Sequence, residues 1–355
     1  MALDSISGIK DSRPTLLVGG KENAALVGGL LSLSVAEDAN GLYCCEAKFG
    51  NWGPVNGAVD FLYFDRKTLD FGQDWQVKLG DDMLFDGRVT ALEANFPLGA
   101  PPEITVLAED RLQDLRMTRR SRAFENMTDA DVARRIAGEH GLTPEIDLNG
   151  PTHQVLAQIN QSDLAFLRER VRALDAEIWV NAKTLGAKPR AARSKDKVKL
   201  THGTQLREFN AIADLANQCT SVTASGWDVA GKSALFFEAK ETVISNELNG
   251  DTSGAAILQQ KFGTRKESLA HAFAHNSRET QFMAEALFRM TARRFVVGHG
   301  VAEPNAKMRV GTYVELDGLG PLFNGKYYLA QVKHLFDNAE GMRTVFCAEK
   351  PGIGK

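Results

Sequence analysis

Two hydrophobic patterns alternate along the chain. Residues 13–109 contain short runs rich in β-branched and aromatic side chains, and segments with glycine or proline separate these runs and reverse the chain. The runs are Leu42–Phe49, Ala58–Phe64, Asp74–Leu79 and Arg88–Phe96. They predict an all-β region, a barrel or a sandwich, because closing a sheet removes the free edges that invite aggregation.

The final run, RVTALEANF, alternates imperfectly between apolar and polar positions. Val89, Ala91 and Phe96 are expected to face a core, while Arg88 and Glu93 face solvent. Successive residues of a strand point to opposite sides, so an alternation that slips by one position indicates an extra residue. The pattern therefore predicts a β-bulge in this run.

A helical period replaces the strand pattern after residue 124. Thr128 is suited to cap one helix, and Ser162 is suited to cap a second helix with apolar residues at steps of three and four. Together with a short strand at Ile178–Val180, these helices predict a small α/β insert over residues 121–180. Packing within the insert is the favoured interpretation of the apolar stripe, and a partner helix is the alternative. The stripe consists of Leu164, Leu167, Val171 and Leu174.

Strand-like runs resume after Leu206 and continue to the end of the chain, with one interruption. The segment SRETQFMAEALFRMTARR has apolar residues at helical spacing, so it predicts one helix within a second β region. The residues at this spacing are Phe282, Ala286, Leu287 and Met290.

Two distant segments share a pattern. Val77–Arg88 reads VKLGDDMLFDGR and Val314–Lys326 reads VELDGLGPLFNGK, which match when one residue is inserted. Downstream, ITVLAED at Ile104–Asp110 is answered by RTVFCAEK at Arg343–Lys350. The order strand, glycine turn, long strand, loop and strand thus occurs twice. It predicts duplication of one β domain, with a chance resemblance between hairpins as the alternative.

Residues 183–199 carry seven basic residues and only one acidic residue, Asp196. We interpret this segment as a mobile, solvated loop, and a docking site for an acidic partner is the alternative. No aromatic residue interleaves the basic ones, so the segment lacks the stacking platform of a single-strand nucleic-acid binder. The candidate partner contacts are Lys188, Arg190, Arg193, Lys195 and Lys197, with Phe85 and Phe323 from the two repeated turns.

Composition restricts the class of protein further. The 355 residues are 43% hydrophobic and 25% charged, which is enough to bury sizeable cores. A net charge of -3 gives no overall attraction to nucleic acid or to anionic membranes. No apolar run approaches the ~18 residues of a membrane span, and the start lacks the pattern of a signal peptide. The four cysteines have no CxxC spacing, so we expect them to be reduced.

One segment matches a phosphate-binding motif. Gly226–Ser233 reads GWDVAGKS, which satisfies the pattern G-x-x-x-x-G-K-[ST]. A phosphate loop requires a helix N-terminus directly after it, whereas the following ALFFEAKETVI suits a strand at least as well. The carboxylates Glu109 and Glu303 are the candidates for an envelope-degrading activity. Neither signal outweighs a non-catalytic interpretation.

Five segments, taken in order, resemble the phage late control gene D protein family, the baseplate hub of contractile tails. They also resemble the amino-terminal hub region of the VgrG proteins of type VI secretion. The segments are FDGRVTALEANFPLGAPPEITVLAEDRLQDL, FENMTDADVARRIAGEHGL, NQSDLAFLRERVRALDAEIWV, SVTASGWDVAGK and RVGTYVELDGLGPLFNGKYYLAQVKHLFD. Together they cover most of residues 10–350.

This resemblance implies two β domains similar to the tail-tube protein, an α/β insert and a homotrimer. Three such chains would place six similar units around one axis, so one face could match a sixfold tube and the other a threefold spike. The implied partners are the tail tube protein, other baseplate proteins, and a spike supplied as a separate chain because this one stops at Lys355. No cofactor, metal, catalytic residue, direct nucleic-acid recognition or stable membrane insertion is implied. Assembly is expected in the bacterial cytoplasm, and the final location is a virion or an extracellular tail-like particle.

We therefore predict a mainly β fold with an α/β insert and two tail-tube-like β-barrel domains related by internal duplication. The predicted domains are residues 1–120, the insertion domain with the basic loop at 121–200, and a second barrel with one inserted helix at 201–355. The predicted function is a structural baseplate hub that joins tube to spike and lines the channel. A P-loop-like nucleotide-binding enzyme and a tail-associated envelope-degrading enzyme are the alternatives.

Overall fold

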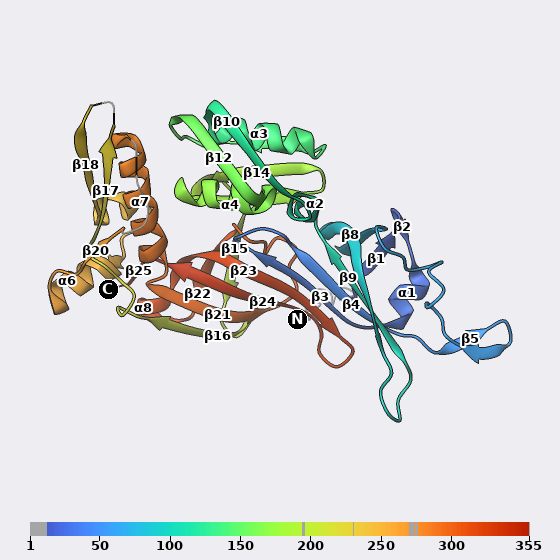
Figure 1. The fold of residues 1–355 in the computed structure, drawn as a ribbon. Coiled ribbons are helices and arrows are strands. Elements are labelled where there is room, and N and C mark those ends of the chain that lie inside the picture. Colours follow the sequence, from blue (N-terminus) through green and yellow to red (C-terminus); the bar gives the residue numbers. More distant parts are fainter. Residues whose placement is uncertain (1–12, 194–195, 230, 270–273, 275, 355) are drawn as a thin grey trace.

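The computed structural model describes residues 13–193, 196–229, 231–269, 274 and 276–354. Over these residues the chain is mainly β, and one large sheet of 13 strands runs through the molecule (Figure 1). Two inserts, each with its own small sheets and helices, stand on this sheet. The prediction of a mainly β fold with an α/β insert is confirmed.

One half of the large sheet is a set of six strands, called here the N-unit. In space these strands follow the order β3-β4-β9-β8-β7-β1, and all neighbours are antiparallel. The short β2 (Lys21–Glu22) extends the edge beyond β1. The six strands are β1 (Thr15–Val18), β3 (Leu30–Asp38), β4 (Cys44–Gly50), β7 (Asp74–Leu79), β8 (Asp82–Asn95) and β9 (Glu103–Glu109).

The other half, called here the C-unit, repeats this arrangement. Its order in space is β16-β21-β24-β23-β22-β15, so each strand has a counterpart at the same place in the sheet and in the chain. One pairing differs, because β15 runs parallel to β22 whereas β1 is antiparallel to β7. The strands are β15 (Lys197–Thr201), β16 (Leu206–Ala213), β21 (Val296–Ala302), β22 (Tyr313–Asp317), β23 (Gly325–Asp337) and β24 (Gly341–Lys350).

The long central strand of each unit carries a β-bulge at the same place. The register of β8 against β9 slips between Val89 and Ala91, and that of β23 against β24 slips between Leu329 and Gln331. The predicted bulge in RVTALEANF is therefore confirmed. A second pair of bulges follows the first residue of β3 and of β16. Shared bulges are strong support for a common origin, since each is a specific local irregularity.

A glycine N–H donates a hydrogen bond to each central strand beside its bulge, a contact called here the glycine clamp. The N–H of Gly72 donates to the carbonyl of Val89 over 2.8 Å, and the N–H of Gly311 donates to the carbonyl of Leu329 over 3.0 Å. Both glycines have positive φ, at 75° and 98°, a region that L-residues with a Cβ rarely adopt. The same backbone device is thus built twice, and it fixes which residues of the two units correspond.

The two units join edge to edge in a single sheet. β3 of the N-unit pairs antiparallel with the second half of β23, from Asp38 opposite Gln331 to Ser32 opposite Asp337. Two closed barrels were expected, but the strand pairings among the described residues form an open path. The edge of β3 pairs with the C-unit, and the corresponding edge of β16 has no partner among these residues, so neither unit closes on itself.

The junction also joins the hydrophobic cores. Trp75 and Phe49 are fully buried in the N-unit core, and they lie edge-to-face with ring centroids 6.2 Å apart. Phe336 and Met342 of the C-unit are buried in this same core. The two units are therefore packed together as well as hydrogen-bonded, and neither core is complete without the junction.

The repeated turns are not aligned as their letters indicate. Counted from the bulges, the counterpart of Arg88 is Tyr328, whereas the sequence match paired it with Lys326. Phe85 lies in β8, but Phe323 ends a short helix, α8 (Gly320–Phe323), that lengthens the second turn. A shift of two residues keeps every side chain on the same face of a strand, which explains why the letters still agree.

The first insert lies between the two units in sequence and has its own core. Both predicted helix caps are confirmed: Thr128 accepts from the Asp131 N–H over 3.1 Å, and Ser162 accepts from the Ala165 N–H over 3.2 Å. Leu164, Leu167 and Val171 of the predicted stripe pack in the core of the insert, and Leu174 is only partly buried. Its elements are α2 (Leu112–Arg116), β10 (Arg119–Thr128), α3 (Asp129–Glu139), β11 (Thr143–Ile146), β12 (Thr152–Ser162), α4 (Asp163–Ala173), β13 (Ala176–Asn181), β14 (Thr184–Pro189) and α5 (Arg190–Arg193).

The second insert interrupts the C-unit between β16 and β21. The predicted helix is present as α7 (Ser277–Arg293), but the insert also holds a further helix and a three-stranded sheet, β18-β17-β20. The other elements are β17 (Ser221–Asp228), β18 (Ser233–Lys240), η1 (Glu241–Glu247), β19 (Thr252–Ser253), α6 (Gly254–Phe262) and β20 (Lys266–Ser268). Outside both inserts lie α1 (Ala24–Gly29), β5 (Gly53–Val55), β6 (Ala58–Asp60) and β25 (Gly352–Ile353).

Candidate assembly interface

The basic segment is not a solvated loop. It forms β14, α5 and the first strand of the C-unit, β15, while Lys195 lies outside the described residues. The side chains of Arg190 and Arg193 are buried between the first insert and the large sheet. The interpretation of the segment as a mobile loop is therefore wrong.

Carboxylates and aromatic rings explain why these two arginines are buried. Arg190 is ion-paired with Glu349 of β24, and its guanidinium lies 3.7 Å from the centroid of the Tyr328 ring. Arg193 donates to Glu177 of the first insert over 2.6 Å and also contacts the Tyr43 hydroxyl. Two buried cations thus meet two carboxylates, which removes most of the cost of burying charge.

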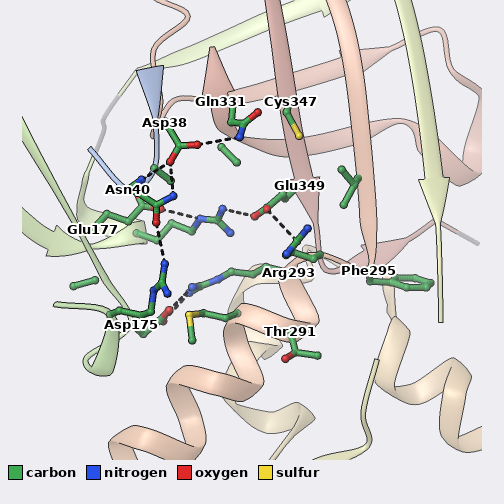
Figure 2. Close-up of a pocket in the computed structure, with 18 of the residues that line it drawn as sticks. Asp38, Asn40, Asp175, Glu177, Thr291, Arg293, Phe295, Gln331, Cys347 and Glu349 are labelled. Atoms are coloured by element: carbon green, nitrogen blue, oxygen red, sulfur yellow. Dashed lines mark hydrogen bonds and ion pairs between the residues drawn. The ribbon is translucent and has the colours of Figure 1, made fainter. Parts of the chain in front are cut away.

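This arginine cluster connects three parts of the molecule. Tyr43 belongs to the N-unit, Glu349 to the C-unit and Glu177 to the first insert. Glu177 and Glu349 are shown in Figure 2. Burial, together with the adjacent Glu177 carboxylate, raises the pKa of the Tyr328 phenol well above its usual value, so its hydroxyl stays protonated and donates to Glu177. The basic residues therefore hold the insert on the sheet.

A second ion-pair cluster holds the two inserts together. Arg293 of α7 binds Asp175 through two nitrogens, at 2.5 and 2.9 Å, and donates to Glu247 over 2.7 Å. Asp175 belongs to the first insert and its pKa is raised, because burial outweighs the nearby arginines. Both inserts are therefore fixed relative to the sheet by buried charged contacts.

A cavity of about 870 Å³ lies where both inserts meet the sheet (Figure 2). Its wall carries as many aspartates and glutamates as arginines, and these side chains are largely bonded to one another. The wall therefore offers no excess charge of either sign to a ligand. The charged lining residues are Asp38, Asp175, Glu177, Asp214 and Glu349, with Arg168, Arg172, Arg190, Arg293 and Arg294.

The remaining predicted contacts are scattered over the molecule. Lys188 is ion-paired with Glu145 over 2.5 Å, and Lys197 is exposed on β15. Phe85 is buried in the N-unit core, whereas Phe323 packs partly buried against the C-unit core. The structure does not bring these residues together, and a partner contact through any of them stays a prediction.

The candidate catalytic residues lie in a β-hairpin and in ion pairs. GWDVAGKS spans the tip of the β17–β18 hairpin, where Ser233 begins a strand, so it lacks the helix N-terminus of a phosphate loop. Glu109 is ion-paired with Arg116 over 2.6 Å, and Glu303 with Arg207 over 2.7 Å. The Arg207 guanidinium lowers the pKa of Glu303, which is opposite to what a general acid requires.

In the part of the chain that the structure describes, no helix is long and apolar enough to cross a membrane. Within the same residues, no cluster of three or more histidine, cysteine or acidic side chains has the geometry of a metal site.

Several strand edges of the large sheet have no partner among the described residues. The short end strands β2 and β15 each pair on one side only, with β1 and with β22. Two longer free edges are the outer edge of β16, which pairs only with β21, and the edge of β8 beyond Val89. Large apolar side chains are exposed beside these edges, namely Phe71, Phe96 and Ile212. The prediction that Phe96 faces a core is wrong, because Phe96 is exposed beyond the end of β8, and no sequence pattern pointed to Phe71 or Ile212.

Phe96 is part of an exposed aromatic patch at the N-unit end of the sheet. Trp52 contacts Phe61 with ring centroids 5.1 Å apart, and Phe96 lies 5.7 Å from Phe64 and 6.2 Å from Phe61. Exposed apolar clusters of this kind mark interaction surfaces in soluble proteins. The free edges of β8 and β16, together with this patch, form the candidate assembly interface.

The fold is that of phage tail proteins. The 43 kDa tail protein of prophage MuSo2 from Shewanella oneidensis superimposes with a TM-score of 0.71 at 14% identity, covering 96% of this chain and 98% of that chain. A tail protein from Neisseria meningitidis MC58 gives 0.67 at 12% identity, covering 96% and 97%. A type VI secretion component of E. coli gives 0.59 at 11% identity, covering 91% and 73%. At such identities the likeness concerns the fold alone.

A family model also matches most of the chain. The chain belongs to the family described as the Alg8 N-terminal domain, whose model matches residues 53–338. This description names a domain and no reaction. No curated protein matches the chain. The fold comparison and the family match thus leave the function to be argued from the structure.

Proposed function

We propose that the chain is a structural hub of a contractile phage tail or a tail-like injection system. The observation that carries this proposal is the duplicated unit, with its six strands in the same order and its bulges at the same positions. Likeness to phage tail proteins over 96% of the chain supports it. Each unit is then one tail-tube-like domain, and together they are related by internal duplication.

Duplication has a direct consequence for symmetry. Three chains with two similar units each present six similar sheets around an axis, so a threefold assembly can match a sixfold tube. The two inserts occur only once per chain and lie on the same side of the large sheet (Figure 1). That side of the ring would repeat three times, as a threefold spike requires.

The proposed role is assembly and passage rather than catalysis. The partners are further copies of this chain, the tail tube protein, a spike protein and other baseplate proteins. The hub would be assembled in the bacterial cytoplasm and become part of a virion or an extracellular tail-like particle. The ion-pair clusters serve this role by fixing the inserts rigidly on the ring-forming sheet.

Measurement of mass and shape in solution tests the proposal. Light scattering should give three times the chain mass of 38.8 kDa, and negative-stain images should show rings with an axial hole and six lobes. A stable twofold dimer would contradict the proposal, because an isologous contact cannot continue around a ring. So would a monomer that persists at the highest soluble concentration with tube and spike proteins added.

A further inference from the structure

We propose that the ring closes by strand pairing between copies, with β8 of one chain antiparallel to β16 of the next. This inference rests on the proposed hub function and names the contact that builds it. The chain contains its own template, since the β3–β23 junction is the same contact made within one molecule. β8 is the counterpart of β23, and β16 is the counterpart of β3.

The shared bulges define the register of the new contact. In the template, Val332 stands opposite Glu37, His334 opposite Val35 and Phe336 opposite Leu33. Counting the same number of residues from the bulges gives the corresponding pairs between two chains. These pairs are Leu92 with Ala213, Ala94 with Ala211 and Phe96 with Phe209 on the core side, and Glu93 with Ile212 and Asn95 with Asn210 on the other side.

Both strands carry the side chains that such a contact needs. On the core side every one of the six positions is apolar. Five of them lie in strands whose opposite edge is already paired, and Phe96 directly follows β8. β16 is regular after its bulge, so its N–H and C=O groups are available to a second strand. Among the described residues, each chain therefore has both a free β8 edge and a free β16 edge.

Counterpart residues of the two units differ in exposure, and the difference shows which N-unit surface lacks a covering strand. Phe336 is 6% exposed because the N-unit covers it, whereas its counterpart Phe96 is 64% exposed. Val310 precedes the glycine clamp of the C-unit and is 4% exposed, whereas Phe71 at the same place in the N-unit is 54% exposed. A second copy paired through β16 would cover Phe96 and Phe71 as the N-unit covers their counterparts.

The proposed contact differs from its template at three neighbouring positions, where an apolar ring stands in place of a buried carboxylate. In the template the buried carboxylate of Glu37 accepts from the Val310 N–H over 3.0 Å and is ion-paired with Arg309. At the corresponding positions the new contact has Ala213, Phe71 and Asp70. The small alanine leaves room for the exposed phenylalanine, so the space filled by an ion pair in the template is filled by an apolar ring between chains.

The contact is heterologous, because the two edges are different surfaces. A chain that donates β8 to one neighbour receives β8 of another on its β16, so the contacts run head to tail. Such contacts form a closed ring when the rotation between copies permits, and a filament when it does not. With two units in each chain, closure at three copies makes all six junctions around the ring alike.

Paired cysteines test this register in the full-length chain. The test variant combines Glu93→Cys and Ile212→Cys in a Cys44→Ser background, which removes the exposed native thiol. Opposite residues have Cβ atoms about 5 Å apart. The matched control combines Glu93→Cys with Glu208→Cys, which lies on the same face of β16 but about 13 Å further along the strand. A short bis-maleimide reagent is added, and the products are separated in denaturing gels.

We expect covalent dimers and trimers from the test pair, a ladder that ends at three chains, and more than tenfold less product from the control. A mixture of the two single-cysteine chains should give dimers only, which shows that the link joins different chains. A trimer by light scattering in which both pairs react equally, or neither reacts, would overturn the register and leave the hub proposal intact. Monomers at all concentrations, also with tube and spike proteins added, would overturn both.

Discussion

The two ends of the duplicated sheet differ mainly in what covers them. The C-unit end of the junction buries Phe336 under the N-unit, while the equivalent Phe96 of the N-unit is exposed. Phe336 lies in β23 and Phe96 directly follows β8. Both strands have the bulge at the same place and pair with counterpart strands, β24 and β9, so strand pairing within each unit does not cause the difference. An exposed aromatic residue on a repeated unit is therefore best understood from its buried counterpart.

Truncation at the buried position should have the largest effect. Phe336→Ala removes a ring from the N-unit core, and we expect the free energy of unfolding to fall by about 3–5 kcal/mol. Denaturation in guanidinium chloride measures this loss. Phe96→Ala is the matched control and should leave the unfolding free energy of the single chain nearly unchanged. Equal losses in both variants would contradict the comparison.

Phe96→Ala should instead weaken the assembly of the chains. Phe96→Ala removes one buried ring from each contact between copies, and we expect the contact to weaken by about 2–3 kcal/mol. Sedimentation velocity at several concentrations would then show trimers dissociating at concentrations at least tenfold higher than for the unaltered chain. A trimer with unchanged affinity would place Phe96 outside the ring contact.

The ion pair between Glu37 and Arg309 is present in the β3–β23 junction and has no counterpart in the proposed contact between chains. Glu37→Gln deprives Arg309 and the Val310 N–H of a buried carboxylate, and we expect a loss of about 2 kcal/mol in the free energy of unfolding. Asp70→Asn, at the place that corresponds to Arg309, removes only an exposed pair with Arg66 and should cause no measurable change. Chemical denaturation of both variants at neutral pH makes this comparison.

A buried histidine gives an effect that is negligible at neutral pH and grows as the pH decreases. Burial lowers the pKa of His334 from 6.5 to about 3, and the nearby Arg309 adds to the shift. Between these two values the unfolded chain binds a proton that the folded chain does not, so His334 destabilises the fold progressively as the pH decreases below about 6.5. The expected loss is at most about 1.4 kcal/mol per pH unit.

His334→Gln should remove this contribution. The difference in unfolding free energy between the unaltered chain and the variant should therefore decrease from pH 6.5 toward pH 3 and stay constant above pH 7. The corresponding residue in β8 is Ala94, so the proposed ring contact contains no equivalent group. A pH-independent difference would show that the pKa of His334 is the same in the folded and the unfolded chain.

Features that depend on neighbouring residues could be predicted from the sequence. The caps at Thr128 and Ser162, the helix Ser277–Arg293 and the bulge after Val89 all arise from short-range patterns, and the structure contains each of them. The repeated pattern also indicated duplication. Its alignment was two residues off around Arg88, because α8 lengthens one turn and strand periodicity conceals an even shift.

Features that depend on distant residues could not be predicted in the same way. Arg190 and Arg193 look like solvated charges in the sequence, because Glu349, Glu177 and Tyr43 that surround them come from three separate regions. The candidate site was missed for the same reason. A free strand edge is defined by the absence of a neighbour among the described residues, and no local pattern of β16 reports it.

The sequence alone determined the element types, the caps, the bulge and the existence of two related β regions, since these follow from propensity and periodicity within a few residues. Only the tertiary structure decided that the two units share one open sheet, that the basic residues are buried under an insert, and which edges are free. Those outcomes depend on which distant strands pair and which charges meet, and such long-range choices leave no signature in a single segment of sequence.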